Sequence, residues 1–199
     1  IIVRPKLSND LKIQIHQALG LDYLDLGNTV RAEDEFKKML EIDAKNKWSL
    51  GMLKNIATDN RSWNDALEYE KKLLKYYPEI KKRDESKLNY FVATDYKDKN
   101  NEKNYLYYLN KSIKGDYVYS ESYLELSSHH IDNTDLAMEY LIQFSKANPS
   151  GSVTAFKKIE HILFDEKRFD DVESLYKKVL DDEFNSYAFN RLVDIHLEK

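Results

Sequence analysis

The chain has 199 residues with only five Gly and three Pro, so it lacks the turn residues of a β-rich protein and favours long helices joined by short loops. A net charge of −4, with acidic and basic residues interleaved, argues against a nucleic-acid-binding protein or a polybasic membrane anchor. The absence of Cys excludes disulfides and thiolate chemistry, and no apolar stretch is long enough to cross a membrane.

The first predicted element is a pair of helices over residues 9–46, which begins near Asn9 with Ser8 or Asn9 as N-cap. Counted from Ile13, its positions eight and twenty are small and its positions eleven and 24 are aromatic. These residues are Gly20, Ala32, Tyr23 and Phe36. Small residues let two antiparallel helices approach closely, and the aromatic rings fill the space beside that contact. Gly27 is expected in the turn between the helices with a positive φ.

The same spacing recurs along the rest of the chain. Units of about 34 residues are predicted at residues 13–46, 47–80, 86–117, 118–152 and 153–185, with a partial unit at 186–199. Residues 81–85 are interpreted as a short charged insertion, and Tyr105 makes the third unit degenerate because it stands where a small residue is expected. We therefore predict one tetratricopeptide-type array over residues 1–199. Its fold class would be an all-α, right-handed superhelical solenoid of antiparallel helix pairs.

Both ends of the chain lie inside the predicted array. The sequence begins at Ile1 without Met, and residues 186–199 form one further apolar helix without a successor. Because stacked repeats bury their apolar faces against neighbours, we expect these residues to be a fragment of a longer protein.

One stretch is more specific than a generic repeat. It combines Arg4-Pro5-Lys6-Leu7-Ser8, Leu19-Gly20, Asp22-Tyr23, Gly27 and Arg31-Ala32-Glu33-Asp34 with Phe36. In order and spacing this stretch resembles the bacterial lipopolysaccharide assembly protein B family, and the close match covers residues 4–75. The resemblance implies a non-catalytic cytoplasmic adaptor, tethered to the inner membrane by a segment outside these residues. Such an adaptor regulates lipopolysaccharide assembly by presenting a biosynthetic deacetylase to a membrane protease.

The candidate partner-binding residues follow from the repeat register. In this fold the first helix of each unit lines the concave face through positions two, five, nine, twelve and thirteen. Mixed aromatic and polar side chains at these positions suit the capture of a peptide or helix. The candidates are Trp48, Asn55, Tyr90, Thr94, Lys97, Tyr119, His129, Lys157, His161 and Phe164. We therefore expect a protein or peptide partner and no nucleic acid.

No pattern of residues indicates catalysis, a metal or a cofactor. His129 and His130 are adjacent on a predicted helix and point about 100° apart, so they rarely reach one ion. The chain has no Gly-x-Ser-x-Gly elbow and no phosphate-binding Gly-rich loop. Gly51 stands where a chaperone-tail clamp needs Lys, and the net charge of −4 disfavours an RNA-binding repeat.

Two alternatives to an adaptor stay open at this point. One is a substrate-docking or regulatory array of a larger enzyme such as a glycosyltransferase, and the other is a periplasmic assembly factor. The sequence flanking residues 1–199 would distinguish them, because a catalytic domain, a signal peptide or a lipid-attachment site would each be visible there.

Overall fold

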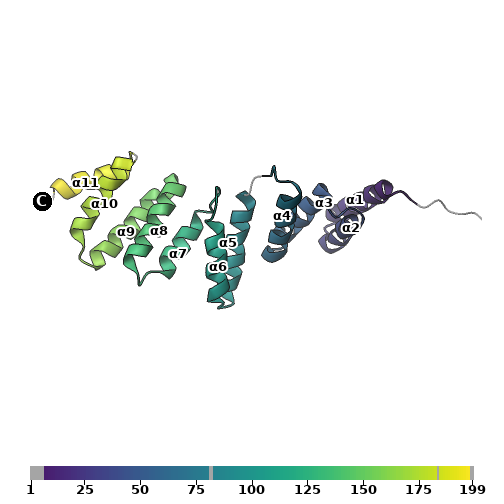
Figure 1. The fold of residues 1–199 in the computed structure, drawn as a ribbon, viewed down its shortest axis with the longest axis horizontal. Helices are drawn as coiled ribbons and strands as arrows, with labels where there is room; N and C mark the ends of the chain where they lie inside the picture. Colours follow the sequence, from purple (N-terminus) through teal and green to yellow (C-terminus); the bar gives the residue numbers. More distant parts are fainter. Residues whose placement is uncertain (1–6, 81–82, 183, 198–199) are drawn as a thin grey trace, which may run out of the picture. The chain divides into compact units, whose positions relative to one another are not determined.

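The computed structural model describes residues 7–80, 83–182 and 184–197, and the chain forms two compact units, unit 1 (residues 1–117) and unit 2 (residues 118–199). Within the described residues there are eleven α-helices and one 3₁₀ turn, and no strand. Successive helices pair through short loops, and pairs pack on their neighbours within each unit (Figure 1). The predicted fold class, an all-α solenoid of helix pairs, is confirmed. The repeat boundaries and the single array stay predictions.

The described residues of unit 1 form three helix pairs. They are α1 (Asn9–Asp25) with α2 (Thr29–Ile42), α3 (Lys47–Asp59) with α4 (Trp63–Tyr76), and α5 (Arg83–Asp98) with α6 (Glu102–Ser112). Side-chain oxygens cap the starts of α1, α2, α3 and α6, where backbone N–H groups lack an intrahelical acceptor. The capping residues are Ser8, Asn28, Asn46 and Asn101. The N-cap predicted at Ser8 is therefore confirmed. The Arg4-Pro5-Lys6 part of the family-like stretch lies outside the described residues.

The first pair shows how the repeat is built. Gly20 on α1 is buried, and a Cβ placed on it would lie 2.1 Å from Cε1 of Phe36 on α2. Phe36 is itself fully buried, as is Ala32 one turn earlier on the same helix. Gly27 has a φ of +71° in the turn that joins α1 to α2. The close approach of the two helices and the positive φ are both confirmed.

The charged residues 81–85 lie at the junction between the second helix pair and α5. Residues 81–82 lie outside the described part of the chain, but residues 83–85 form the first turn of α5. Asp84 and Glu85 in that turn favour a helix N-terminus because their charges complement the macrodipole. Asp84 also accepts a hydrogen bond from the ammonium of Lys54 on α3 at 2.9 Å, which ties α5 to the preceding pair. The interpretation of residues 81–85 as an insertion between two repeat units stays a prediction.

Unit 2 contains five α-helices among its described residues. They are α7 (Glu121–His129), α8 (Thr134–Ala147), α9 (Ser152–Asp165), α10 (Phe169–Asp182) and α11 (Ser186–Leu197), with a 3₁₀ turn at Pro149–Gly151. The core of the unit includes Phe156 and Tyr176, whose rings meet edge-on at 5.9 Å, together with Ile159 and Leu163. Residues 198–199, which were expected to belong to the last helix, lie outside the described part.

Polar side chains occupy positions eight and 24 in two later units, where the first pair has a glycine and an aromatic ring. In the second unit these residues are Lys54 and Glu70, and Nζ lies 3.1 Å from Oε2. In the fifth unit they are Glu160 and Tyr176, and the tyrosine hydroxyl donates to Oε1 at 2.7 Å. Nε of Arg191 on α11 donates to the same oxygen at 2.7 Å. In these two pairs a hydrogen bond therefore joins the two helices at positions eight and 24.

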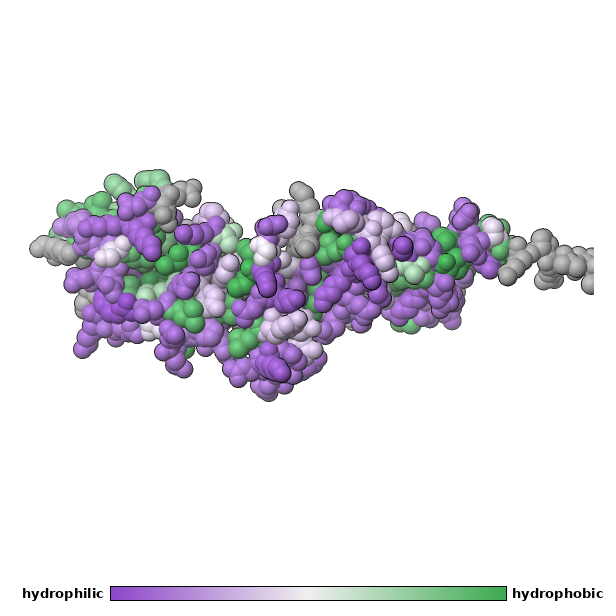
Figure 2. Space-filling model, viewed as in Figure 1, coloured by the Kyte–Doolittle hydropathy of each residue, from purple (hydrophilic) through white to green (hydrophobic). Residues whose placement is uncertain are grey.

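Hydrophobic side chains are exposed along α1 and at the α11 end of unit 2. On α1 a stripe of Leu11, Ile15 and Leu19 recurs every four residues, and each is about two-fifths exposed. In unit 2 the exposed hydrophobic residues include Phe184, Phe189, Val193 and Leu197. Figure 2 shows hydrophobic surface over this end of the unit. Repeat proteins commonly bury such faces against further helices. No helix in the described ranges is long and apolar enough to span a membrane.

Candidate partner-binding site

Unit 1 contains a cavity of about 310 Å³ formed by α3, α5 and the start of α4. Trp63 and Phe91 form its aromatic wall, because their rings stack with centroids 4.4 Å apart and planes 17° apart. Buried Leu88 adds further apolar surface. Trp63 is the first residue of α4 and Phe91 lies midway along α5, so the stack joins two helix pairs. A flat aromatic wall offers a large contact area to an apolar side chain.

Lys54 is the most constrained charged group of the cavity. Its ammonium donates to Oδ2 of Asp84 at 2.9 Å and to Oε2 of Glu70 at 3.1 Å. Burial opposes the charge of Lys54, but these two carboxylates prevail and raise its pKa. Burial raises the pKa of Glu70, which is 1% exposed and whose Oε1 has no hydrogen-bond partner among the described residues. The ammonium of Lys54 is therefore already paired with two carboxylates of its own chain.

Asn55 and Lys87 supply the exposed polar groups of the cavity. Asn55 is exposed on α3, and Nζ of Lys87 lies 5.9 Å from the ring centroid of Phe91 in a cation–π contact. The hydroxyl of Thr58 is occupied, because it donates to the carbonyl of Lys54 at 2.8 Å within α3. The site can thus hold an apolar side chain against the rings. The Asn55 amide can hydrogen-bond to a peptide backbone, and Lys87 can attract a carboxylate.

The residues predicted on α3 and at the middle of α5 differ in their relation to this cavity. Asn55 lines it, and Tyr90 adjoins it through Phe91, whose ring it contacts edge-on at 5.5 Å. Trp48 instead packs edge-on against Phe36 at 5.2 Å, in the core formed by the first two pairs. The structure therefore brings Asn55 and Tyr90 to one region and places Trp48 elsewhere.

The other two predicted residues of unit 1 lie further along α5. The hydroxyl of Thr94 donates to the carbonyl of Phe91 at 2.7 Å, within its own helix. Nζ of Lys97 lies 5.6 Å from the ring centroid of Tyr105 on α6. Neither side chain lines the cavity. Their role in binding stays a prediction.

Sequence reasoning missed six of the residues that line the cavity. They are Lys54, Trp63, Asp84, Lys87, Leu88 and Phe91. Two features of the sequence pointed toward these residues. A lysine stands at position eight of the second unit, where the first has glycine, and an acidic residue stands at its position 24. Phe91 directly follows the candidate Tyr90, so the assumed register selected a neighbour of the cavity residue.

In unit 2 three of the predicted residues lie on one face of α9. They are Lys157, His161 and Phe164, which follow one another at steps of four and three residues and are all exposed. Nδ1 of His161 lies 3.2 Å from Oδ2 of Asp165 on the same helix. This face combines two basic groups with an aromatic ring that is 42% exposed.

The two remaining predicted residues lie at the ends of α7. Tyr119 precedes the helix and is half-buried, and this burial raises its pKa. The ring of His129 contacts that of His130 edge-on at 4.9 Å, and His130 stacks on Tyr140 of α8. These contacts are packing contacts between aromatic rings. Across the described ranges, no group of three His, Asp or Glu side chains is arranged to hold a metal ion.

Comparison with known proteins identifies the fold but not a family. No family model matches this chain, and no curated protein matches it at a significant level. YrrB, described as a tetratricopeptide-repeat protein with an unusual peptide-binding site, aligns at 14% identity with a TM-score of 0.47 over 92% of this chain and 95% of YrrB. A solved structure of MamA aligns at 21% identity with a TM-score of 0.50 over 85% of this chain and 91% of MamA. The chain has the fold of a tetratricopeptide-repeat solenoid.

Proposed function

We propose that the chain is a non-catalytic scaffold that binds a protein or peptide partner, and that the cavity between α3 and α5 is its binding site in unit 1. The stacked pair of Trp63 and Phe91, beside the exposed side chains of Asn55 and Lys87, carries this proposal. An aromatic wall flanked by a few polar groups suits an apolar anchor residue of a peptide. Because rigid helices present all four side chains, the site is largely formed before the partner binds.

The charges of the cavity favour an acidic peptide. Lys54 is already paired with Asp84 and Glu70, whereas Lys87 lies over an aromatic ring and is exposed. A carboxylate of a partner would therefore be attracted to Lys87. The proposed ligand places a Leu or aromatic side chain against the ring pair and a Glu or Asp beside this lysine.

Tryptophan fluorescence tests the site directly. The chain has two Trp, so the variant Trp48→Phe leaves Trp63 in the cavity as its only reporter. A synthetic hexapeptide with a central Leu flanked by Glu should change the Trp63 emission in a saturable manner. Lys87→Glu should weaken that binding about tenfold, and the same peptide with Lys in place of Glu should bind more weakly than the Glu peptide.

A matched charge reversal controls for the overall charge of the chain. Lys103→Glu lies at an exposed position on α6 and should leave peptide binding unchanged. Phe91→Ala should abolish binding while the helical circular dichroism signal persists. If neither peptide alters the emission up to about 1 mM, or if Lys103→Glu and Lys87→Glu act alike, this cavity is not the binding site.

The lipopolysaccharide assembly role is a finer proposal that rests on the resemblance of residues 4–75 alone. No sequence comparison supports it, and no observation favours an enzyme-docking array or a periplasmic assembly factor. The resemblance implies one partner, the deacetylase of lipid A synthesis. A titration of that enzyme against the purified chain tests this directly, and a failure to bind at about 100 μM would remove the finer proposal while leaving the scaffold proposal intact.

A further inference from the structure

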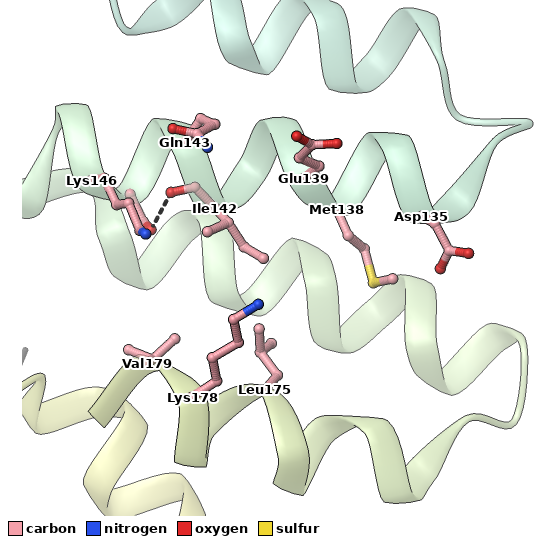
Figure 3. A pocket seen from close by; sticks show the side chains of 10 residues that line it. Asp135, Met138, Glu139, Ile142, Gln143, Lys146, Leu175, Lys178 and Val179 are labelled. Carbon is pink, nitrogen blue, oxygen red and sulfur yellow. Dashed lines mark hydrogen bonds between the residues drawn. The ribbon is translucent and has the colours of Figure 1, made fainter. Parts of the chain in front are cut away.

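Unit 2 carries a second groove, on the faces of α8 and α10, that none of the predicted residues lines. Its volume is about 410 Å³. The half-buried side chains of Met138 and Ile142 on α8 and of Leu175 and Val179 on α10 form its apolar floor. Figure 3 shows Met138 and Ile142 pointing from α8 toward Leu175 on α10. Each helix thus contributes two apolar residues four positions apart.

Opposite charges lie along the rim of this groove. Asp135 and Glu139 lie in the first half of α8, whereas Lys146 on α8 and Lys178 on α10 lie in the second half of their helices. Asp135 is occupied, because its Oδ1 accepts from Nη1 of Arg168 at 2.9 Å. Glu139 and Lys178 are exposed and form no ion pair within the described part of the chain.

We propose that this groove docks an amphipathic helix of a partner protein. The partner helix would insert apolar side chains four residues apart between α8 and α10. It would carry a basic side chain beside Glu139 and an acidic one beside Lys178. Spacings of three and four residues place side chains on one face of a helix, which matches a floor built from two such pairs. The charges at the two ends select a partner helix whose own ends differ in charge.

This inference does not depend on the proposed site in unit 1, because the groove belongs entirely to unit 2. With both sites occupied, the chain would hold two partners at once. That would make it a bridging scaffold rather than a simple peptide receptor. The two proposals are tested by different ligands and different variants, so either can fail alone.

The probes are three fluorescein-labelled helical peptides of about 15 residues with the same Leu residues four apart. One has Lys at one end and Glu at the other, one has Lys at both ends, and one has Glu at both ends. By fluorescence anisotropy the mixed peptide should bind the full chain about tenfold more tightly than either of the others. Such a preference would show that both charged ends of the groove take part.

Two variants of the protein locate the binding. Lys178→Glu should weaken binding of the mixed peptide about tenfold and strengthen binding of the all-Lys peptide, since the rim then becomes more acidic. Lys158→Glu, at an exposed position of α9 outside the groove, should change neither affinity. Leu175→Glu should abolish binding, and circular dichroism will show whether its helices persist. The exposed Lys178→Glu keeps the test valid if the Leu175 variant unfolds.

Four results would overturn the proposal. All three peptides could bind equally or not at all up to about 1 mM, or Lys158→Glu could act like Lys178→Glu. Sedimentation equilibrium covers the remaining occupant, a second copy of the chain. If wild-type protein self-associates and Lys178→Glu abolishes this, the groove is an interface between copies and not a docking site for a partner helix.

Discussion

Replacing Gly20 on α1 by Ala should destabilise unit 1, whereas replacing Gly51 on α3 by Ala should stabilise unit 1. Gly20 lies within α1, and an added Cβ would be 2.1 Å from Cε1 and 2.7 Å from Cδ1 of Phe36. Phe36 is fully buried, and Trp48 contacts its ring edge-on at 5.2 Å. The ring therefore has little room to move aside, and the helices themselves must separate.

The size of the effect follows from two opposing contributions. Ala is favoured over Gly in a helix interior by about 1 kcal/mol. Forcing an extra carbon into a well-packed core costs about 1–3 kcal/mol, and such a short contact places Gly20→Ala at the upper end of that range. The expected net loss is about 2 kcal/mol. Gly51 lies within α3 with nothing within 4 Å of an added Cβ, so Gly51→Ala should gain about 1 kcal/mol.

Urea unfolding followed by tryptophan fluorescence measures this difference in unit 1, because Trp48 and Trp63 both lie there. Phe36→Leu in the Gly20→Ala background should cost less than the two single changes added together, since the shorter side chain removes the clash. If Gly20→Ala stabilises the protein as much as Gly51→Ala does, the contact between α1 and α2 is not as close as described, and the packing argument fails.

Three further substitutions test the buried polar groups. Tyr176→Phe removes the hydroxyl that donates to Glu160 at 2.7 Å and should cost about 1.5–3 kcal/mol in urea unfolding, whereas Tyr107→Phe, at a 54% exposed ring, should be nearly neutral. Although burial acts the other way, the hydrogen bonds from its lysine and histidine partners lower the pKa of Glu35. Its carboxylate therefore adds stability above about pH 4.5 that is lost as the pH falls through its folded-state pKa, and Glu35→Gln should be most harmful near neutral pH. Burial raises the pKa of Glu70. The stability that its protonated carboxyl contributes is therefore present below about pH 4.5 and is lost as the pH rises through the folded-state pKa. The stability of Glu70→Gln relative to wild type should accordingly increase toward neutral pH. Unfolding curves at pH 4, 5.5 and 7 measure both trends, and if the two variants changed in the same direction, one of the two assignments would be wrong.

The features of the first helix pair could be predicted because they depend on local spacing. A glycine that meets an aromatic ring, a glycine with positive φ and a serine N-cap each depend on residues within one helix pair. Gly20, Gly27 and Ser8 were therefore assigned correctly from the sequence. The charged residues before Ser86 are different, because the sequence did not show that α5 already begins at Arg83 or that Asp84 bonds to another helix pair. Their role depends on Lys54, which comes from a different helix pair.

The binding cavity could be predicted only in part, for a related reason. Asn55 was selected from its position in the repeat, but Trp63 belongs to the second helix of its unit, whose positions were not counted. The cavity exists because the ring of Trp63 reaches Phe91 of the next pair. A rule that counts positions on first helices alone does not describe a wall built from both kinds of helix. The aromatic stack therefore required the tertiary structure.

The exchange of small and aromatic residues for ionic ones links stability to the proposed site. Lys54 and Glu70 stand where the first pair has a glycine and an aromatic ring. A buried ion pair contributes little net stability, because the cost of desolvating the two charges offsets their attraction. A gain in stability therefore does not explain this replacement. The location of Lys54 between three helices offers a better explanation for the replacement. Lys54 on α3 bonds to Glu70 on α4 and Asp84 on α5, and so connects the three helices that form the cavity. We infer that these two hydrogen bonds help to specify the relative placement of the three helices. The departure from the repeat pattern thus coincides with the surface proposed to bind a partner.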